Sequence, residues 1–371
     1  MTPPVRGRRS VLAVGFLLAL AMRALYLFSS HEKNWDLDAY REVVGVLESG
    51  GELYRDTPRY NYSPVWSIVL RGLSALSRAA AAPLEKGVGA LLLLADVATA
   101  WLVFRIARDV LGRPPEAAAA AALLFFANPV SVFATGFHLQ FDNLAVFFLL
   151  AAVWSISATP ARPARNAATV VFLSASLLFK HVTYFHPLLF VRTRQRTGVT
   201  LLAGLAPYAL FFASFLPYMG SASSVYERVF AYRSLGETYG AAALLDLPGV
   251  PRWAPTALFV TAAGVGLVLF RRLEVGRASL LLFLLLLVFL PGVVQYYFVW
   301  PIALGALYGG AGYAVYTLAV SSFFLGSPDG LALPLTHLPG WHGVWWATVL
   351  WLLLELRTLA REKAARARPS R

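Results

Sequence analysis

Long apolar runs separated by short polar segments extend along the chain from Val11 to Leu356. A helix needs about 20 mainly apolar residues to cross a bilayer, and several of these runs approach that length. The pattern predicts an all-α polytopic membrane protein with about 12 transmembrane segments. They are expected at residues 11–28, 87–105, 117–135, 143–158, 167–180, 182–191, 199–217, 256–270, 278–290, 298–309, 311–326 and 343–358.

A thirteenth candidate, residues 64–80, has a different pattern. It contains Arg71 and Arg78, and its apolar residues fall on one face, as in a helix that lies along the membrane surface. Pro64 suits the first turn of such a helix. If 64–80 does not cross the membrane, the basic clusters of the chain all lie on the same side of the membrane as the N-terminus. That side then has 20 Lys and Arg residues against 4 acidic ones, and the opposite side has 10 against 13. The positive-inside rule therefore predicts cytoplasmic termini and an interfacial helix in the first outer loop.

Two segments are too short for complete crossings. Residues 167–191 must leave and return to the cytoplasmic side, but two crossings need about 40 residues and only 25 are present. We therefore expect a broken hairpin with Lys180 and His181 at its tip. Residues 298–309 are also short and are expected to turn at Gly309-Gly310. Broken helices occur where they are buried in protein or line a wet cavity.

Composition and charge exclude other classes of protein. Of the 371 residues 58% are hydrophobic and 14% charged, against about a quarter charged in soluble domains. The net charge of +13 could suggest nucleic-acid binding, but residues 31–60 are net −3 and the rest net +16. The positive excess lies in the cytoplasmic segments and is a topology signal, so no nucleic-acid partner is expected. Cysteine is absent, which excludes thiolate metal sites and cysteine nucleophiles.

The topology places the candidate chemistry on the outer side of a single domain, 1–371, formed by the outer loops 29–86, 218–255 and 327–342. The first loop contains Asp36 and Asp38 in the densest acidic cluster of the chain. A solvated acidic loop is the alternative interpretation.

Polar residues also occur in the later outer turns. His138, Gln140 and Asp142 alternate and would face the same way in an extended turn, unless they only hydrogen-bond within a helix–helix turn. Lys180 and His181 lie where charge is costly and usually functional, with snorkelling to the interface as the alternative. The remaining candidates are Arg228 and Arg233, which salt bridges to Glu227 and Glu237 would also explain, and Gln295 and Tyr296, for which aromatic-belt anchoring is the favoured alternative. Asp96 is expected to pair with Arg23 inside the bundle.

These motifs resemble those of the GT-C class of membrane glycosyltransferases, which use polyprenyl- or dolichyl-phosphate-linked sugars. Asp36-Leu37-Asp38, Tyr60-Asn61-Tyr62-Ser63-Pro64 and Gln295-Tyr296-Tyr297-Phe298-Val299-Trp300 resemble the mannosyltransferases that add the first mannose in glycosylphosphatidylinositol synthesis. The motifs His138-Leu139-Gln140-Phe141-Asp142-Asn143 and Phe179-Lys180-His181-Val182 are more similar to the dolichyl-phosphate-glucose glucosyltransferases of N-glycan assembly. Mannose and glucose therefore both stay open.

The resemblance implies transfer of a hexose, with inversion, from a polyprenyl- or dolichyl-phosphate donor to a hydroxyl of a lipid-linked or other glycan acceptor. Asp36 would be the catalytic base, and Asp38 would orient the acceptor or share a divalent metal, although no cofactor is required by the sequence. Lys180, His181 and Arg233 would hold the donor phosphate. His138, Gln140 and Asp142 would hydrogen-bond a sugar or support the hairpin. The other substrate-binding candidates are Arg228, Tyr62, Gln295 and Tyr296. An accessory membrane subunit is compatible with the resemblance. The expected location is the plasma membrane of a prokaryote or the endoplasmic reticulum of a eukaryote.

Two alternatives to a transferase remain. A transporter or flippase of lipid-linked sugars would concentrate ionisable groups at the membrane midplane and often shows repeated halves, whereas most acids here lie in outer loops and no internal repeat is evident. A non-catalytic membrane scaffold would give no reason for Asp36, Lys180 and the broken helices to occur together.

Overall fold

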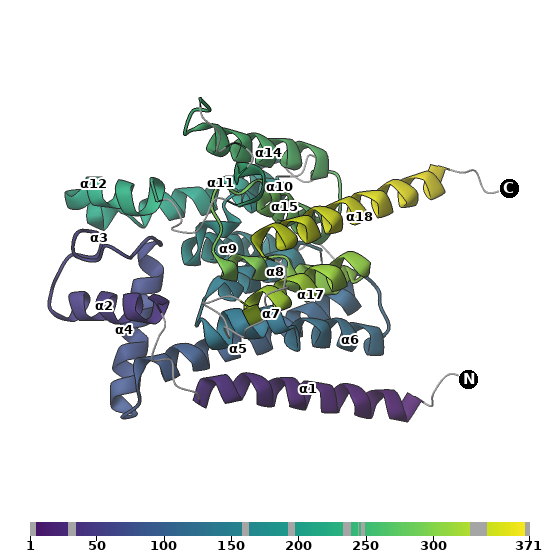
Figure 1. Cartoon of the computed structure of the whole chain (residues 1–371), viewed down its shortest axis with the longest axis horizontal. Coiled ribbons are helices and arrows are strands. Elements are labelled where there is room, and N and C mark those ends of the chain that lie inside the picture. Colours follow the sequence, from purple (N-terminus) through teal and green to yellow (C-terminus); the bar gives the residue numbers. More distant parts are fainter. Residues whose placement is uncertain are drawn as a thin grey trace. The chain divides into compact units, whose positions relative to one another are not determined.

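The computed structural model describes residues 5–28, 35–157, 163–191, 197–232, 239–243, 245, 249–326 and 340–367. All regular secondary structure in these ranges is helical, which confirms the predicted all-α class (Figure 1). The chain divides into two compact units, Met1–Arg233 and Ser234–Arg371.

The first unit is built on long helices joined by short helical turns. The elements in chain order are α1 (Val5–Phe28), α2 (Trp35–Glu48), α3 (Leu53–Asp56), α4 (Pro64–Ala79), α5 (Leu84–Arg105), η1 (Ile106–Val110), α6 (Pro115–Phe126), α7 (Pro129–Val132), η2 (Phe133–Phe137), α8 (Asp142–Ser157), α9 (Pro163–Phe179), η3 (His181–Thr183), α10 (His186–Leu189), α11 (Thr197–Ala213), η4 (Leu216–Ser221), α12 (Ala222–Val225) and η5 (Tyr226–Phe230).

Helix α8 lies at the centre of this unit. It packs against α9 and α5, while α9 also contacts α11, and α5 also contacts α6 and α1. Apolar side chains occupy nearly every turn of α8, so no single polar face forms, and eleven of its sixteen residues are buried. A helix that is apolar all round is typical of the interior of a bundle.

The predicted helix at residues 64–80 is confirmed as α4. The Ser63 hydroxyl accepts a hydrogen bond from the backbone N–H of Val65 at 3.4 Å, and Pro64 occupies the first helical position. Proline suits this position because its missing N–H would have no partner there. In Figure 1, α4 runs across the direction of α1.

The second unit contains α13 (Gly240–Ala243), α14 (Ala254–Phe270), α15 (Val275–Phe289), η6 (Gln295–Val299), α16 (Ile302–Tyr308), α17 (Ala311–Gly326) and α18 (Trp341–Ala367). Gly309 and Gly310 have φ values of 64° and 94° and form the predicted turn after α16. The indole ring of Trp351 in α18 packs closely against Gly305 and Gly312. A Cβ added at either glycine would lie 2.4 Å from this ring.

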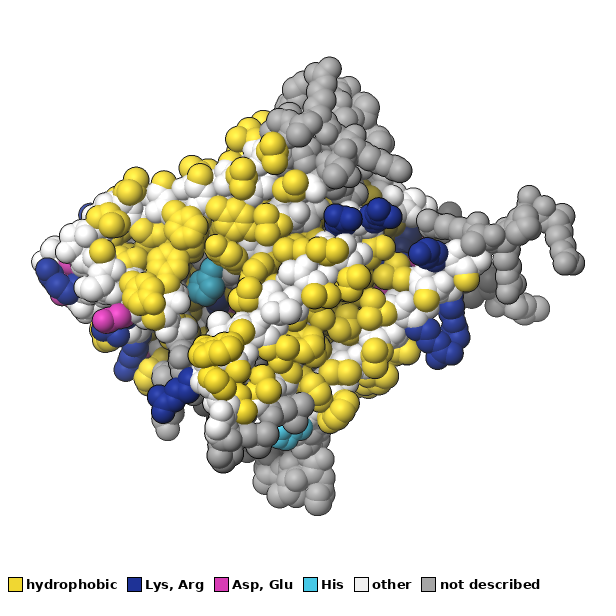
Figure 2. All heavy atoms as spheres, turned by 90° about the horizontal axis from the view of Figure 1, so that it is seen from above, with side chains coloured by type: hydrophobic (Ala, Val, Ile, Leu, Met, Phe, Trp, Pro, Cys, Tyr) yellow, Lys and Arg dark blue, Asp and Glu magenta, His cyan; other side chains and the backbone are white. Residues whose placement is uncertain are grey.

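Two helical segments of the described chain are long and apolar enough to cross a membrane. They are Leu84–Val110 and Trp341–Ala365, and Pro115–Phe126 with Pro129–Phe137 adds a third if this pair, bent by 47°, is one span. Six further apolar helices have 10–17 residues. Hydrophobic side chains predominate on the face shown in Figure 2. By length and composition the described residues thus support membrane association.

The structure also corrects three local predictions. The predicted outer loop 29–86 contains two helices, α2 and α3, besides α4, and the predicted loop 218–255 begins with helical turns that extend to Phe230. The predicted segment 117–135 is interrupted at Asn128-Pro129. Proline lacks the N–H that would continue the helix, and the Asn128 side chain instead accepts a hydrogen bond from the N–H of Val130 at 2.9 Å.

Candidate functional site

The two predicted catalytic carboxylates lie on different sides of α2. Asp36 and Asp38 are both in the first turn of this helix, whose buried side carries Leu37 and Tyr40. Residues two positions apart on a helix point about 200° apart. Asp36 is partly buried, whereas the Asp38 side chain is 52% exposed and pairs with Arg41 at 3.3 Å. The helix therefore separates the pair that the sequence places side by side.

Lys180 lies at the break that was predicted in the hairpin. Helix α9 ends at Phe179, and Lys180 is extended, with φ −153°. Its side chain is only 2% exposed, forms an ion pair with Asp142 and donates to Gln140 Oε1 at 3.2 Å. Burial of this cation is therefore offset by a charged partner and a hydrogen bond.

Two aromatic rings complete the surroundings of the Lys180 ammonium. The nitrogen lies 5.1 Å from the centre of the Tyr62 ring and 4.8 Å from that of Phe141, within range of cation–π attraction. The two rings meet edge to face at 4.8 Å. Tyr62, a candidate from the sequence, is thus confirmed as a neighbour of the Lys180 ammonium. Phe141 is a second neighbour that the sequence did not indicate, because it is an apolar residue between polar ones.

The turn between η2 and α8 is tightly folded, not extended as predicted. Leu139 has a φ of +53°, a conformation that residues other than glycine rarely adopt, and its carbonyl accepts from the Tyr40 hydroxyl at 3.3 Å. Gln140 and Asp142 are nonetheless both fully buried and both contact Lys180. His138 is 8% exposed, and its ring packs edge-on against Phe137.

The charges of Lys180 and Asp142 and the side chain of Gln140 act on the Asp36 carboxyl group. Burial raises its pKa from 3.8 to about 6, while the positive charge of Lys180 and a hydrogen bond from the Gln140 side chain oppose that rise, and the charge of Asp142 adds to it. A carboxyl group with a pKa near 6 is largely ionised at neutral pH and is a stronger base than an ordinary aspartate. Asp36, Gln140, Asp142 and Lys180 together form what we call the Asp36 site.

The remaining candidates of the first unit lie on η3 and η5. His181 is partly buried, and its Nδ1 has no hydrogen-bond partner among the described residues. Within the same ranges the Nε of Arg228 is buried without a partner. Arg233 lies outside the described residues. Tyr232, which the sequence did not single out, is close enough to Asp36 that the carboxylate, after burial, raises the pKa of its phenol.

Gln295 and Tyr296 belong to the second unit, where they begin η6 and are 5% and 9% exposed. In the described ranges no group of three or more His, Asp or Glu side chains is arranged to hold a metal ion. Asp36 and Asp38, the residues for which the sequence allows a shared divalent metal, lie on different sides of α2.

No protein-family model matches the sequence, and no curated protein matches it significantly. The chemistry of the Asp36 site therefore carries the functional argument.

Proposed function

We propose that the protein is a membrane glycosyltransferase of the GT-C class that transfers mannose or glucose from a polyprenyl- or dolichyl-phosphate donor. The proposal rests on one observation: Asp36 of α2, the turn residues Gln140 and Asp142, and Lys180 after α9 lie close together although they come from three separate parts of the chain. An apolar membrane protein has little reason to gather two carboxylates and a cation in one buried place unless they serve a function.

Asp36 is the general base of the proposed reaction. Its carboxylate takes the proton of the acceptor hydroxyl as the acceptor oxygen bonds to the anomeric carbon. The bond from that carbon to the phosphate oxygen breaks at the same time, and the electron pair leaves with the polyprenyl phosphate. A single displacement of this kind inverts the anomeric centre. The phosphate is a good leaving group, so one base and nearby cations suffice.

Lys180 keeps Asp36 ionised by its charge, while Asp142 and Gln140 hold Lys180 in place. Because Lys180 is already paired, we assign Arg228, whose Nε has no partner among the described residues, to the donor phosphate, together with Arg233. Burial and the charge of Lys180 lower the pKa of His181 to about 4, so we assign it only a hydrogen bond to that phosphate from a neutral ring. Charge develops on that phosphate as the bond breaks, so cations placed there stabilise the transition state.

The proposed setting is an integral membrane protein with about 12 crossings, cytoplasmic termini and α4 as an interfacial helix. Apolar helices shorter than 18 residues, among them α8, α14, α15 and α17, support this proposal, since broken and short segments occur in bundles that enclose a polar site. Exposed apolar side chains on α1, such as Leu17 and Leu18 at 65% and 66%, suit contact with lipid.

The test uses purified protein in lipid vesicles with labelled polyprenyl-phosphate mannose or glucose and a panel of glycolipid acceptors. Wild type is expected to transfer one of the two sugars. Asp36→Asn should lower kcat by about 10²–10⁴-fold, the usual contribution of a general base. The proposal gives Asp38 no part in the reaction, because its side chain is 52% exposed and pairs with Arg41 on another side of α2, so Asp38→Asn is the matched control. Equal transfer by Asp36→Asn and wild type would refute the base assignment.

A transporter or flippase of lipid-linked sugars is the second candidate, and the buried ion pair of Arg23 and Asp96 favours it, because ionisable groups inside membrane bundles often mark transport paths. The same vesicles separate the two functions. Movement of the labelled lipid between leaflets without sugar transfer would support the transporter and refute the transferase.

A further inference from the structure

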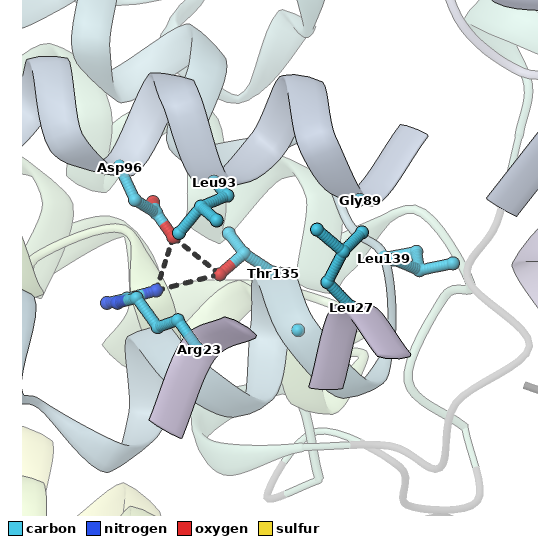
Figure 3. A pocket seen from close by; sticks show the side chains of 8 residues that line it. Arg23, Leu27, Gly89, Leu93, Asp96, Thr135 and Leu139 are labelled. Carbon is cyan, nitrogen blue, oxygen red and sulfur yellow. Dashed lines mark hydrogen bonds and ion pairs between the residues drawn. The ribbon is translucent and has the colours of Figure 1, made fainter. Parts of the chain in front are cut away.

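Arg23 of α1 and Asp96 of α5 form the predicted ion pair, buried inside the first unit. Their side chains are 2% and 1% exposed. Figure 3 shows both groups turned toward the Thr135 hydroxyl of η2, beside a small recess that is also lined by Leu27, Gly89, Leu93, Gly136 and Leu139. Ser131 and Asn143 complete the group, which we call the Asp96 cluster.

Each nitrogen of the Arg23 guanidinium donates at least one hydrogen bond. Its Nε donates to the carbonyl of Phe126 at 2.9 Å, and Nη2 donates to Ser131 Oγ at 2.9 Å. Its Nη1 pairs with Asp96 and also donates to Thr135 Oγ1 at 3.1 Å. A buried ion pair is weak support for stability in itself, because apolar residues of similar volume often replace such a pair at little cost or with a gain. Its hydrogen bonds to neighbouring segments are therefore the informative feature.

Asp96 bonds to both ends of the turn that holds Gln140 and Asp142, two members of the Asp36 site. One carboxylate oxygen, Oδ2, lies 2.7 Å from the Thr135 hydroxyl, just before the turn, and shares the single proton of that hydroxyl with the Ser131 carbonyl at 2.8 Å. The other, Oδ1, accepts from Asn143 Nδ2 at 2.8 Å, just after it. Between them lie residues 136–142, which include Gln140 and Asp142.

The enclosed turn needs such support. Leu139 has its unfavourable positive φ at the middle of this turn. Asn143 directly follows Asp142 in the first turn of α8, so a rotation of Asn143 about the helix axis would also move the carboxylate that holds Lys180. Lys180 in turn is the cation that most strongly favours the ionised form of Asp36.

We propose that Asp96, with Arg23 as its counter-ion, is a positioning residue for the Asp36 site: it fixes Thr135 and Asn143 and thereby the turn that places Gln140 and Asp142 against Lys180. The catalytic meaning of this role rests on the proposed function, whereas the placement of Asp36, Lys180 and the turn does not.

Three variants test the role. The two bonds from Asp96 to Thr135 and Asn143 form what we call the clamp. Asn143→Ala and Thr135→Val each remove one end of the clamp and leave the ion pair intact. The double exchange Arg23→Met with Asp96→Leu removes both charges together, which preserves folding better than leaving one charge unpaired. Thr99→Ala is the matched control, since Thr99 is also fully buried on α5, but its hydroxyl donates to Ala95 of its own helix at 2.7 Å.

The first readout does not depend on activity. A hydrophobic carbodiimide modifies protonated carboxyl groups, and mass spectrometry of the Asp36 peptide after labelling at pH 4.5 to 8.5 gives the apparent pKa of this group. Wild type and Thr99→Ala are expected to show half-labelling near pH 6. Loss of the clamp moves Lys180 away from Asp36, and labelling should then persist to higher pH in all three clamp variants.

The second readout is transfer. The clamp variants should lose about 10–100-fold in kcat with little change in donor KM, the size expected when a base is displaced by about 1 Å. Folded clamp variants with wild-type labelling profiles would overturn the positioning role. A shifted labelling profile in a protein whose wild type transfers neither sugar would keep the positioning role and refute the proposed function instead.

Discussion

Replacing Asp36 with asparagine should stabilise the protein at neutral pH as well as remove the proposed base. Burial raises the pKa of this carboxyl from 3.8 to about 6, so its charged form is less favourable in the folded than in the unfolded chain. At about 1.4 kcal/mol per pH unit, the gap is a cost of at most about 3 kcal/mol. Partial exposure of the side chain reduces this to about 1–3 kcal/mol through solvent screening.

The sign follows from proton linkage. A carboxyl with a raised folded-state pKa binds a proton more tightly when folded, so it destabilises the folded protein progressively as the pH rises from about 4 to 6, and fully above that. Asparagine has the shape of the protonated acid and no charge. Asp36→Asn should therefore be more stable than wild type at pH 7.5 and equal to it near pH 4.

Thermal unfolding of the detergent-solubilised protein, followed by tryptophan fluorescence at pH 7.5 and 4.5, measures this effect. We expect a rise in Tm of a few degrees for Asp36→Asn at pH 7.5, most of which disappears at pH 4.5. The exposed Asp38→Asn should match wild type at both values. An unchanged or lower Tm at pH 7.5, or the same gain at both pH values, would refute the argument that burial raises the pKa of Asp36.

Three further changes test separate parts of the account. Lys180→Gln removes the charge that most lowers the pKa of Asp36, so the acid limb of the transfer rate should move above pH 6, and an unmoved limb would contradict the contact. Glu52→Ala removes the carboxylate that accepts from two backbone N–H groups at the start of α3 and should cost about 1 kcal/mol in unfolding measurements, whereas no loss would argue against this cap. Gly312→Val places side-chain atoms against Trp351, where even a Cβ would lie at 2.4 Å, and should lower stability by about 1–3 kcal/mol or prevent folding, so a wild-type Tm would show that the helices are not this close.

The sequence was informative where a local rule decides the structure. Ser63 and Pro64 form an ordinary helix start, and α4 begins there. The hairpin 167–191 had too few residues for two crossings, and the helix does break before Lys180. Arg23 and Asp96 were expected to pair because an isolated charge is too costly inside an apolar bundle.

Helix α2 could have been found and was not. Leu37, Tyr40, Val44 and Leu47 follow the three-to-four-residue spacing of a buried helix face, but the density of acids favoured a loop. The helical periodicity would also have shown that Asp36 and Asp38 point in different directions.

Other features depend on packing that no local pattern reveals. Leu139 has a positive φ although it is not a glycine. Asp96 of α5 bonds to Thr135 and Asn143 on either side of this turn, and these bonds offset the unfavourable backbone conformation. Along the chain, Asp96 is more than 70 residues from Arg23 and about 40 residues from Thr135, yet its side chain bonds to both. Such hydrogen bonds arise only once the helices are placed, so the sequence indicated the ion pair and not its link to the candidate site.

Sugar transfer by matched Asp36→Asn and Asp38→Asn proteins is the most direct test of the central claim. In vesicles supplied with labelled polyprenyl-phosphate mannose or glucose and the acceptor panel, we predict that Asp38→Asn retains most of the wild-type rate and that Asp36→Asn loses at least about 100-fold. Equal rates for the two variants, or no transfer of either sugar by the wild type, would contradict the claim that Asp36 is the base of a membrane glycosyltransferase.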